Sequence, residues 1–298
     1  MSFSDFEEPL SSLTVALDPV GEGDEFHTRN ASPQDFERQN VIRRLSKSVN
    51  VHCELIDVQH GHLGADRDAD DLATLLVLRF RFDPQDTDRR VIKSRVNIEF
   101  FSADRTNDDD PPVVEAIAPN ERWSLLPTKD QESVTRGGEL SLGVSQIVSA
   151  SGKVTLEKSV TKEDVTDATV VTGFKHLATG KDAGEDTCAS WTLLENKSRK
   201  SGVPNALNVA LLLSRENDEP FNAKVTIEAE CDFTTNFKRF WKKVPLDDPI
   251  LFNPKAEPKR HKRGRSHGGV NLGGLDLYSF CDATMSAKAF WAIGASTE

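Results

Sequence analysis

The chain has 298 residues, 37% of them apolar, and its 37 Lys and Arg against 48 Asp and Glu give a formal net charge of −11. This acidic balance disfavours attraction of the whole surface to nucleic acid or to an anionic membrane. No run of about 18 apolar residues is present, so we expect no transmembrane helix. The acidic N-terminus lacks the apolar region of a secretory signal, which predicts an intracellular protein of the cytoplasm or nucleus.

Residues 1–47 are predicted to form an acidic arm that is largely flexible, with a partly helical segment. Three prolines and the turn-rich segment G-E-G-D-E disfavour regular structure over most of it. Ser32 is a suitable N-cap, Pro33 fits the first helical position, and Asp35 lies in the first turn, where a negative charge suits the helix dipole. A short helix is therefore expected within 32–45.

The β body is predicted to begin with three segments of alternating apolar and polar residues at 49–59, 73–83 and 90–101. A period of two is typical of a strand with one face in a core and the other in water. The loop D-P-Q-D-T-D-R between the second and third segments has the turn chemistry of a hairpin. This pattern predicts that Phe80 and Phe82 lie in the same sheet layer as the third segment.

Short strands continue along the rest of the body, and the clearest is 223–233, A-K-V-T-I-E-A-E-C-D-F, which alternates over its whole length. A turn-rich connection joins it to 206–215, which predicts a second hairpin. The prolines of 247–254 allow only an edge segment there. The other predicted strands lie within 113–119, 122–127, 139–144, 153–158, 168–174 and 188–196.

Strands of this length, separated by turn signals, predict an all-β fold, an antiparallel two-sheet β-sandwich over residues 48–252. Residues 253–298 are expected to form a basic linker followed by a short apolar tail, which either folds back on the body or anchors a partner. A mixed α+β fold is the alternative if both 32–45 and 283–293 are packed helices.

The polar loop 60–71 contains carboxylates at alternate positions, Asp66, Asp68 and Asp70, as calcium-binding loops do. A second acidic loop, 107–110, could pair with it at the same end of a sandwich. The glycine of an EF-hand loop is missing, however, so a solvated acidic loop is the alternative interpretation.

His60 and His62, in the segment H-G-H, would point to the same side of an extended chain. There, His52 or Asp57 could complete a transition-metal site. Nothing local supplies an ordered second shell of hydrogen bonds for such a site. The alternative is a pair of loop histidines without a ligand, and we expect no bound cofactor.

A basic run interrupts this acidic chain within seven positions near the C-terminus, at Lys259, Arg260, Lys262, Arg263 and Arg265. Such clusters serve as nuclear-import signals or as phosphate-binding patches. The run has no interleaved aromatic residues, which disfavours stacking on bases. A solvated linker that associates with the acidic arm is the alternative, and contact with nucleic acid is expected only through this run.

No nucleophile elbow, P-loop, dinucleotide-binding or zinc-protease motif is present. The four scattered cysteines are expected to be free thiols, with Cys53 and Cys231 on apolar strand faces. These observations predict a non-catalytic protein-interaction or scaffold module whose partner is a protein. The rival hypothesis is an enzyme, or a small-ligand or metal-binding protein, with its site in loops at one end of the sandwich. Its candidate groups are His52, His60, His62, Asp66, Asp68 and Asp70.

Overall fold

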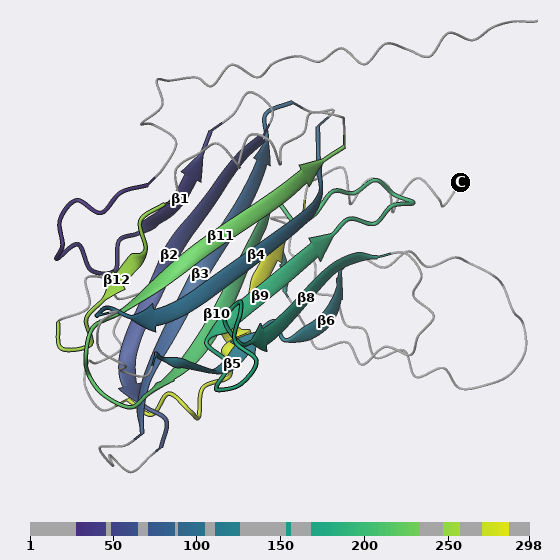
Figure 1. Ribbon diagram of the computed structural model, residues 1–298. Helices are drawn as coiled ribbons and strands as arrows, with labels where there is room; N and C mark the ends of the chain where they lie inside the picture. The colour runs from purple at the N-terminus through teal and green to yellow at the C-terminus, as the bar shows by residue number, and fades with distance from the viewer. Residues whose placement is uncertain are drawn as a thin grey trace, which may run out of the picture.

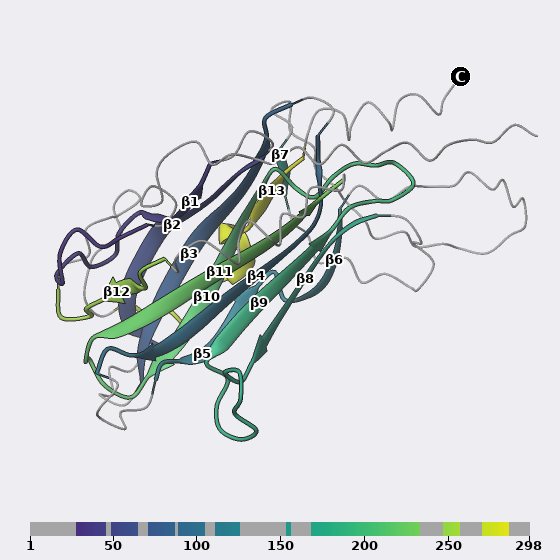
Figure 2. The same cartoon turned by 45° about the horizontal axis from the view of Figure 1, so that its top comes forward.

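The structure is a computed structural model that describes residues 28–45, 49–64, 71–86, 89–104, 111–125, 168–232, 247–256 and 270–285, and the backbone of 153–155. These residues form two antiparallel β-sheets packed face to face, which confirms the predicted two-sheet β-sandwich (Figure 1). The long strands of both layers run in nearly the same direction (Figure 2), as in aligned sheet packing.

Sheet B, the rear layer in Figure 1, has the strand order β1-β2-β3-β10-β13-β7, and β5 also pairs with β10. Its strands are β1 (Asn40–Arg44), β2 (Val49–His62), β3 (Leu72–Pro84), β5 (Val113–Ala118), β7 (Lys153–Thr155), β10 (Ala206–Arg215) and β13 (Asp282–Thr284). A short 3₁₀ helix, η1 (Leu277–Phe280), precedes β13.

Sheet A, the front layer, has the strand order β12-β11-β4-β9-β8-β6. Its strands are β4 (Val91–Ser102), β6 (Glu121–Leu125), β8 (Thr169–His176), β9 (Cys188–Leu194), β11 (Phe221–Cys231) and β12 (Ile250–Phe252). β11 contains most of the clearest alternating segment of the sequence. β12 lies at the edge of the sheet, where its flanking prolines predicted it.

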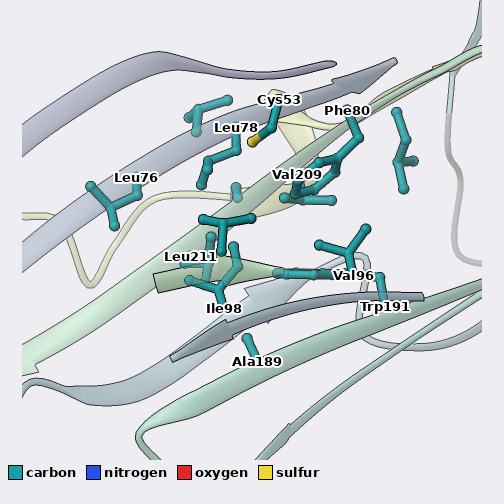
Figure 3. Close-up of a cluster of buried hydrophobic side chains, with 14 of the residues drawn as sticks. Cys53, Leu76, Leu78, Phe80, Val96, Ile98, Ala189, Trp191, Val209 and Leu211 are labelled. Carbon is teal, nitrogen blue, oxygen red and sulfur yellow. The ribbon is translucent and has the colours of Figure 1, made fainter. Parts of the chain in front are cut away.

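Apolar side chains from the facing sides of the two sheets form one continuous core (Figure 3). Removing a Leu or Phe side chain from water contributes about 1.5–3 kcal/mol, so this core is the main source of the fold's stability. The residues labelled in Figure 3 are each at most 1% exposed: Cys53, Leu76, Leu78, Phe80, Val209 and Leu211 from sheet B, and Val96, Ile98, Ala189 and Trp191 from sheet A.

Both predicted hairpins are wrong, because each turn carries the chain from one sheet to the other. β3 pairs with β2 and β10, whereas β4 pairs with β11 and β9. β10 and β11 are likewise in different sheets. Phe80 therefore faces Val96 and Ile98 across the core, not within one layer. Period two indicates which face of a strand is buried but not which strand lies beside it, and a polar turn can join two sheets as well as two neighbours.

The helix predicted within 32–45 is also wrong. Ser32 caps a turn, since its Oγ accepts a hydrogen bond from the amide of Gln34 at 3.2 Å, and the chain then enters β1 instead of a helix. Val41 and Ile42 of β1 are each 2% exposed. Burial of both side chains beside β2 outweighs the weak helical stripe that the sequence offers.

The N-terminal segment that contains β1 is fastened to sheet A. Phe36 forms a bridge with Leu251 of β12. Arg44 donates two hydrogen bonds to the carboxylate of Asp247, one of them 2.8 Å long, and both side chains are less than 10% exposed. These contacts join the free edge of β1 in sheet B to the β12 edge of sheet A.

The segment 270–285 folds back on sheet B. Folding back on the body was one of the two arrangements predicted for the tail, and anchoring a partner was the other. β2 continues through the H-G-H segment, which was predicted to be loop, and His62 pairs with the chain at Val270 and Leu272. β13 then pairs with β10. The sandwich thus contains strands from both sides of residues 48–252.

Candidate functional site

The outward side of sheet A, called here the sheet A face, is made by residues that alternate with core residues along β11, β4, β9 and β8. Most of them are at least partly exposed, whereas Val170, Cys188 and Ser190 are buried. The strand register aligns them in four rows across the sheet. The rows are Glu230, Lys93, Leu194 and Val170; Glu228, Arg95, Thr192 and Thr172; Thr226, Asn97, Ser190 and Phe174; and Lys224, Glu99, Cys188 and His176.

A hydrogen-bonded cluster lies at the centre of this face. His176 Nδ1 is 2.7 Å from the carbonyl oxygen of Leu177, and only a protonated Nδ1 can donate to that acceptor. His176 Nε2 is 2.8 Å from Ser190 Oγ and 3.1 Å from Asn97 Oδ1, and Ser190 Oγ is 2.7 Å from the same Asn97 oxygen. Ser190 has one hydroxyl proton, so it donates to either Asn97 or His176 at a time.

The Ser190–His176 pair has the spacing of a nucleophile and its base, but its surroundings do not complete such a site. Ser190 is only 4% exposed. It lies on β9 between β4 and β8, so the amides around it point into the ladders on either side and are not directed at a developing oxyanion. The cluster therefore fixes the polar centre of the face in place.

Two large apolar side chains project from the same face beside this cluster. Phe174 is 46% exposed and Leu194 is 40% exposed. The Phe174 ring contacts the His176 ring at a centroid distance of 5.3 Å. Exposed Phe and Leu on a surface whose polar groups bond to one another provide apolar contact area for a macromolecule.

Charged residues of opposite sign face each other across β11 and β4. The register places Lys224 opposite Glu99, Glu228 opposite Arg95, and Glu230 opposite Lys93. Lys93 Nζ is 3.7 Å from Glu230 Oε1 in an exposed ion pair. Three basic and three acidic residues balance, so this region is formally neutral although the whole chain carries −11.

Two of the histidines considered as metal ligands, His52 and His60, lie far apart. His60 Nδ1 is 2.8 Å from Thr74 Oγ1, and its Nε2 is 3.4 Å from Glu37 Oε1, in a pocket where the imidazole is 9% exposed. His52 lies eight residues from His60 on the same strand, about 26 Å away at 3.3 Å per residue. Burial is the main cause that lowers the pKa of His52.

Within the part of the chain that the structure describes, no group of three or more His, Cys, Asp and Glu side chains could hold a metal ion. Asp66, Asp68 and Asp70, the acidic loop 107–110 and the basic run lie outside the described residues, so no position is assigned to them. A depression beside the β10–β11 connection is lined by Ser102, Arg215 and Phe221, among others, and has room for about one water molecule.

The four cysteines are free thiols, as the sequence predicted. Burial raises the pKa of Cys281 to about 12 and that of Cys231 to about 11, and it raises the pKa of Cys53 well above the ordinary value. A thiol with such a pKa is almost entirely protonated at neutral pH, so these side chains are poor nucleophiles.

Sequence reasoning did not find the cluster of Asn97, Ser190 and His176. The three residues come from three strands, and each is an ordinary polar residue in an alternating pattern. The only local signal was that Ser190 and His176 occupy the outward phase of their strands. Their meeting depends on β4, β9 and β8 being neighbours, which the alternation does not encode.

Comparison of the chain with protein-family models, with curated proteins and with solved structures finds no match. Among the described residues no helix has the length and apolar character needed to cross a membrane. The geometry of the sandwich and of its sheet A face is therefore the basis of the functional argument.

Proposed function

We propose that the protein is a non-catalytic protein-interaction module that binds its partner through the sheet A face. The observation that carries this proposal is the exposure of Phe174 and Leu194 on one open face of a sheet. Aromatic and large aliphatic side chains surrounded by polar residues are the usual energetic centre of a protein interface.

The electrostatics of the face support a protein partner over a nucleic acid. Binding to a phosphate backbone needs a surplus of Lys and Arg, whereas the rows of β11 and β4 are formally neutral. The polar cluster around Ser190 is internally hydrogen-bonded. It can therefore be covered by a partner without leaving groups unpaired, which keeps the desolvation cost low.

Site-specific photocrosslinking in cells tests this proposal. Phe174 is replaced by p-benzoylphenylalanine, and the matched control carries the same residue in place of Leu45, which is 43% exposed and lies outside sheet A. We expect one defined protein adduct from position 174, lost when Leu194→Asp is added on the same face. No adduct, or equal adducts from both positions, would contradict the proposal.

We also propose that the protein acts inside the cell, with nuclear import directed by the basic run Lys259, Arg260, Lys262, Arg263 and Arg265. The support is the reversal of charge within a chain of −11. Contact with nucleic acid or another phosphate through the same residues is the alternative use of that charge. Two measurements distinguish these uses. Loss of an import signal changes the location of the protein in the cell, whereas the affinity of a phosphate-binding patch falls as the salt concentration rises.

A further inference from the structure

The charges of the sheet A face reverse sign about its third row, which contains Thr226, Asn97, Ser190 and Phe174. Along β11, Lys224 lies two residues before Thr226 of this row and Glu228 two residues after it. Along β4, Arg95 and Glu99 occupy the same two rows with the opposite signs. The first row repeats the order of the second, with Glu230 on β11 and Lys93 on β4.

We propose that the sheet A face binds a second copy of this chain, with a two-fold axis that runs across the strands along the third row. This inference rests on the proposed function and names the partner. A rotation of 180° about this axis places each strand against the same strand of the second copy. The two strands then run in opposite directions. Every contact between two different residues is therefore made twice, and a residue on the axis meets its own copy, as in the isologous interface of a symmetric dimer.

The charge pattern becomes complementary under this rotation. Glu228 of one copy lies opposite Lys224 of the second copy, and Arg95 lies opposite Glu99 of the second copy. An axis parallel to the strands, between β11 and β4, would also pair opposite charges, because the charged residues of these two strands lie opposite one another. The axis along the third row is preferred because it also places Phe174 against Phe174 of the second copy. The strands of two packed sheets cross at about 30°. The contacts are therefore confined to residues close to the axis.

Phe174 lies in the row that coincides with the axis. The axis therefore brings Phe174 of one copy against Phe174 of the other and covers a ring that is 46% exposed in one chain. His176, Ser190 and Asn97 hold the middle of the face rigid beside it. The same side chain thus supplies the apolar centre of both halves of the interface.

The overall charge opposes self-association over most of the surface, but not at this face. Two chains of −11 repel one another over most of their surfaces. The neutral rows of β11 and β4 are a region where two copies can approach, and their pattern replaces repulsion by pairing.

The size of the face predicts a weak dimer. With strands about 4.8 Å apart and about 3.3 Å per residue, the four rows span about 19 by 23 Å. This area is smaller than the roughly 800 Å² that each partner contributes to a standard interface. We therefore expect association in the micromolar range, which depends on concentration and weakens with salt.

Sedimentation velocity of the purified full chain over a range from about 1 to 500 μM tests the proposal. We expect a shift from monomer to dimer for the unmodified protein. Phe174→Arg, which places two like charges together at the axis, should weaken association at least about tenfold. Leu45→Arg, at a similarly exposed residue outside sheet A, should leave it unchanged. Circular dichroism confirms that both variants remain folded.

A charge-exchange experiment isolates the predicted axis. Glu228→Lys alone brings two Lys side chains together, because position 228 lies opposite Lys224 of the second copy. Lys224→Glu alone brings two Glu side chains together in the same way. Each variant alone should therefore associate more weakly than the unmodified protein. An equimolar mixture of the two should recover association, because each mixed contact joins Lys to Glu.

The outcomes separate this inference from the function on which it rests. A monomer at every concentration, a dimer unaffected by Phe174→Arg, or a mixture no stronger than its components overturns the dimer. A photocrosslinked adduct of two identical chains from position 174 supports it. An adduct with a different protein, together with a monomeric purified chain, overturns the dimer and leaves the interaction module standing.

Discussion

Trp191 donates its indole Nε1–H to the carbonyl oxygen of Pro119 at 2.9 Å, in the core between the two sheets. Pro119 lies where the chain leaves β5 of sheet B and enters β6 of sheet A. Gly173 of β8 faces the same carbonyl: a Cβ atom there would lie 2.1 Å from the Pro119 oxygen and 2.8 Å from Trp191 Nε1. The indole hydrogen bond can exist because residue 173 has no side chain.

Gly173→Ala is therefore expected to lower the free energy of unfolding by about 1–3 kcal/mol, as overpacking in a core does. The obstacle is a backbone oxygen that cannot rotate away. Gly274→Ala is the matched control, since its nearest neighbour atom would be 3.7 Å away, and it should be nearly neutral. Chemical denaturation measures both values, and equal effects would show that the crossing from β5 to β6 adapts to the added methyl group.

The ion pair of Arg44 and Asp247 gives a second prediction. Asp247→Ala leaves the buried Arg44 guanidinium without its carboxylate partner, so it should cost about 3–5 kcal/mol. Lys255 and Glu219 form a pair at 2.7 Å whose side chains are 59% and 57% exposed. Glu219→Ala should therefore change the free energy of unfolding by less than about 1 kcal/mol. Similar losses in both variants would contradict the role of burial.

The buried thiols give a prediction about pH. The folded state raises the pKa of Cys281 from 9.0 to about 12 because burial favours the neutral thiol. The stability that this burial contributes is therefore complete below pH 9 and is lost as the pH rises toward 12. In the native protein at pH 8, Cys281 should not react with a disulfide reagent, and denaturant should release its reaction. Rapid labelling without denaturant would show that the site opens locally.

Replacing Lys259, Arg260, Lys262 and Arg263 by Ala tests the basic run as an import signal. We expect thermal stability to remain nearly unchanged, since exposed charges contribute less than about 1 kcal/mol each. A fluorescent fusion should move from the nucleus toward the cytoplasm. An unchanged distribution would reduce the run to a solvated linker, and a large loss of stability would show that it packs on the sandwich.

The alternation of β4 and β11 sufficed to predict the fold class, because each of these strands buries one face over most of its length and the period of two is visible without partners. The pairing of strands was not predictable in the same way. β3 and β4, and likewise β10 and β11, are adjacent in sequence but lie in opposite sheets. The choice between a hairpin and a crossing depends on which partners complete each sheet, and these come from distant segments.

The candidate site was less accessible to prediction than the fold. The segment with the richest ligand chemistry in the sequence predicted a candidate metal site that includes His60, yet His60 contacts Thr74 and Glu37. The residues that now matter, Phe174 and Asn97, share one row only because β8, β9 and β4 are neighbours. A pattern of charges that reverses sign about a row cannot be recognised until the register is known.

One edge of β10 is shared by two strands that are far apart in the chain. β5 pairs with Ala210–Ser214, and β13 pairs with Ala206–Asn208. During synthesis, β10 is made more than sixty residues before β13. The amides and carbonyls along the Ala206–Asn208 edge therefore have no hydrogen bonds to β13 until Thr284 has emerged from the ribosome. Sheet B therefore closes only after β13 has been made, and the interval before closure is when a nascent chain is most open to pairing with the wrong strand.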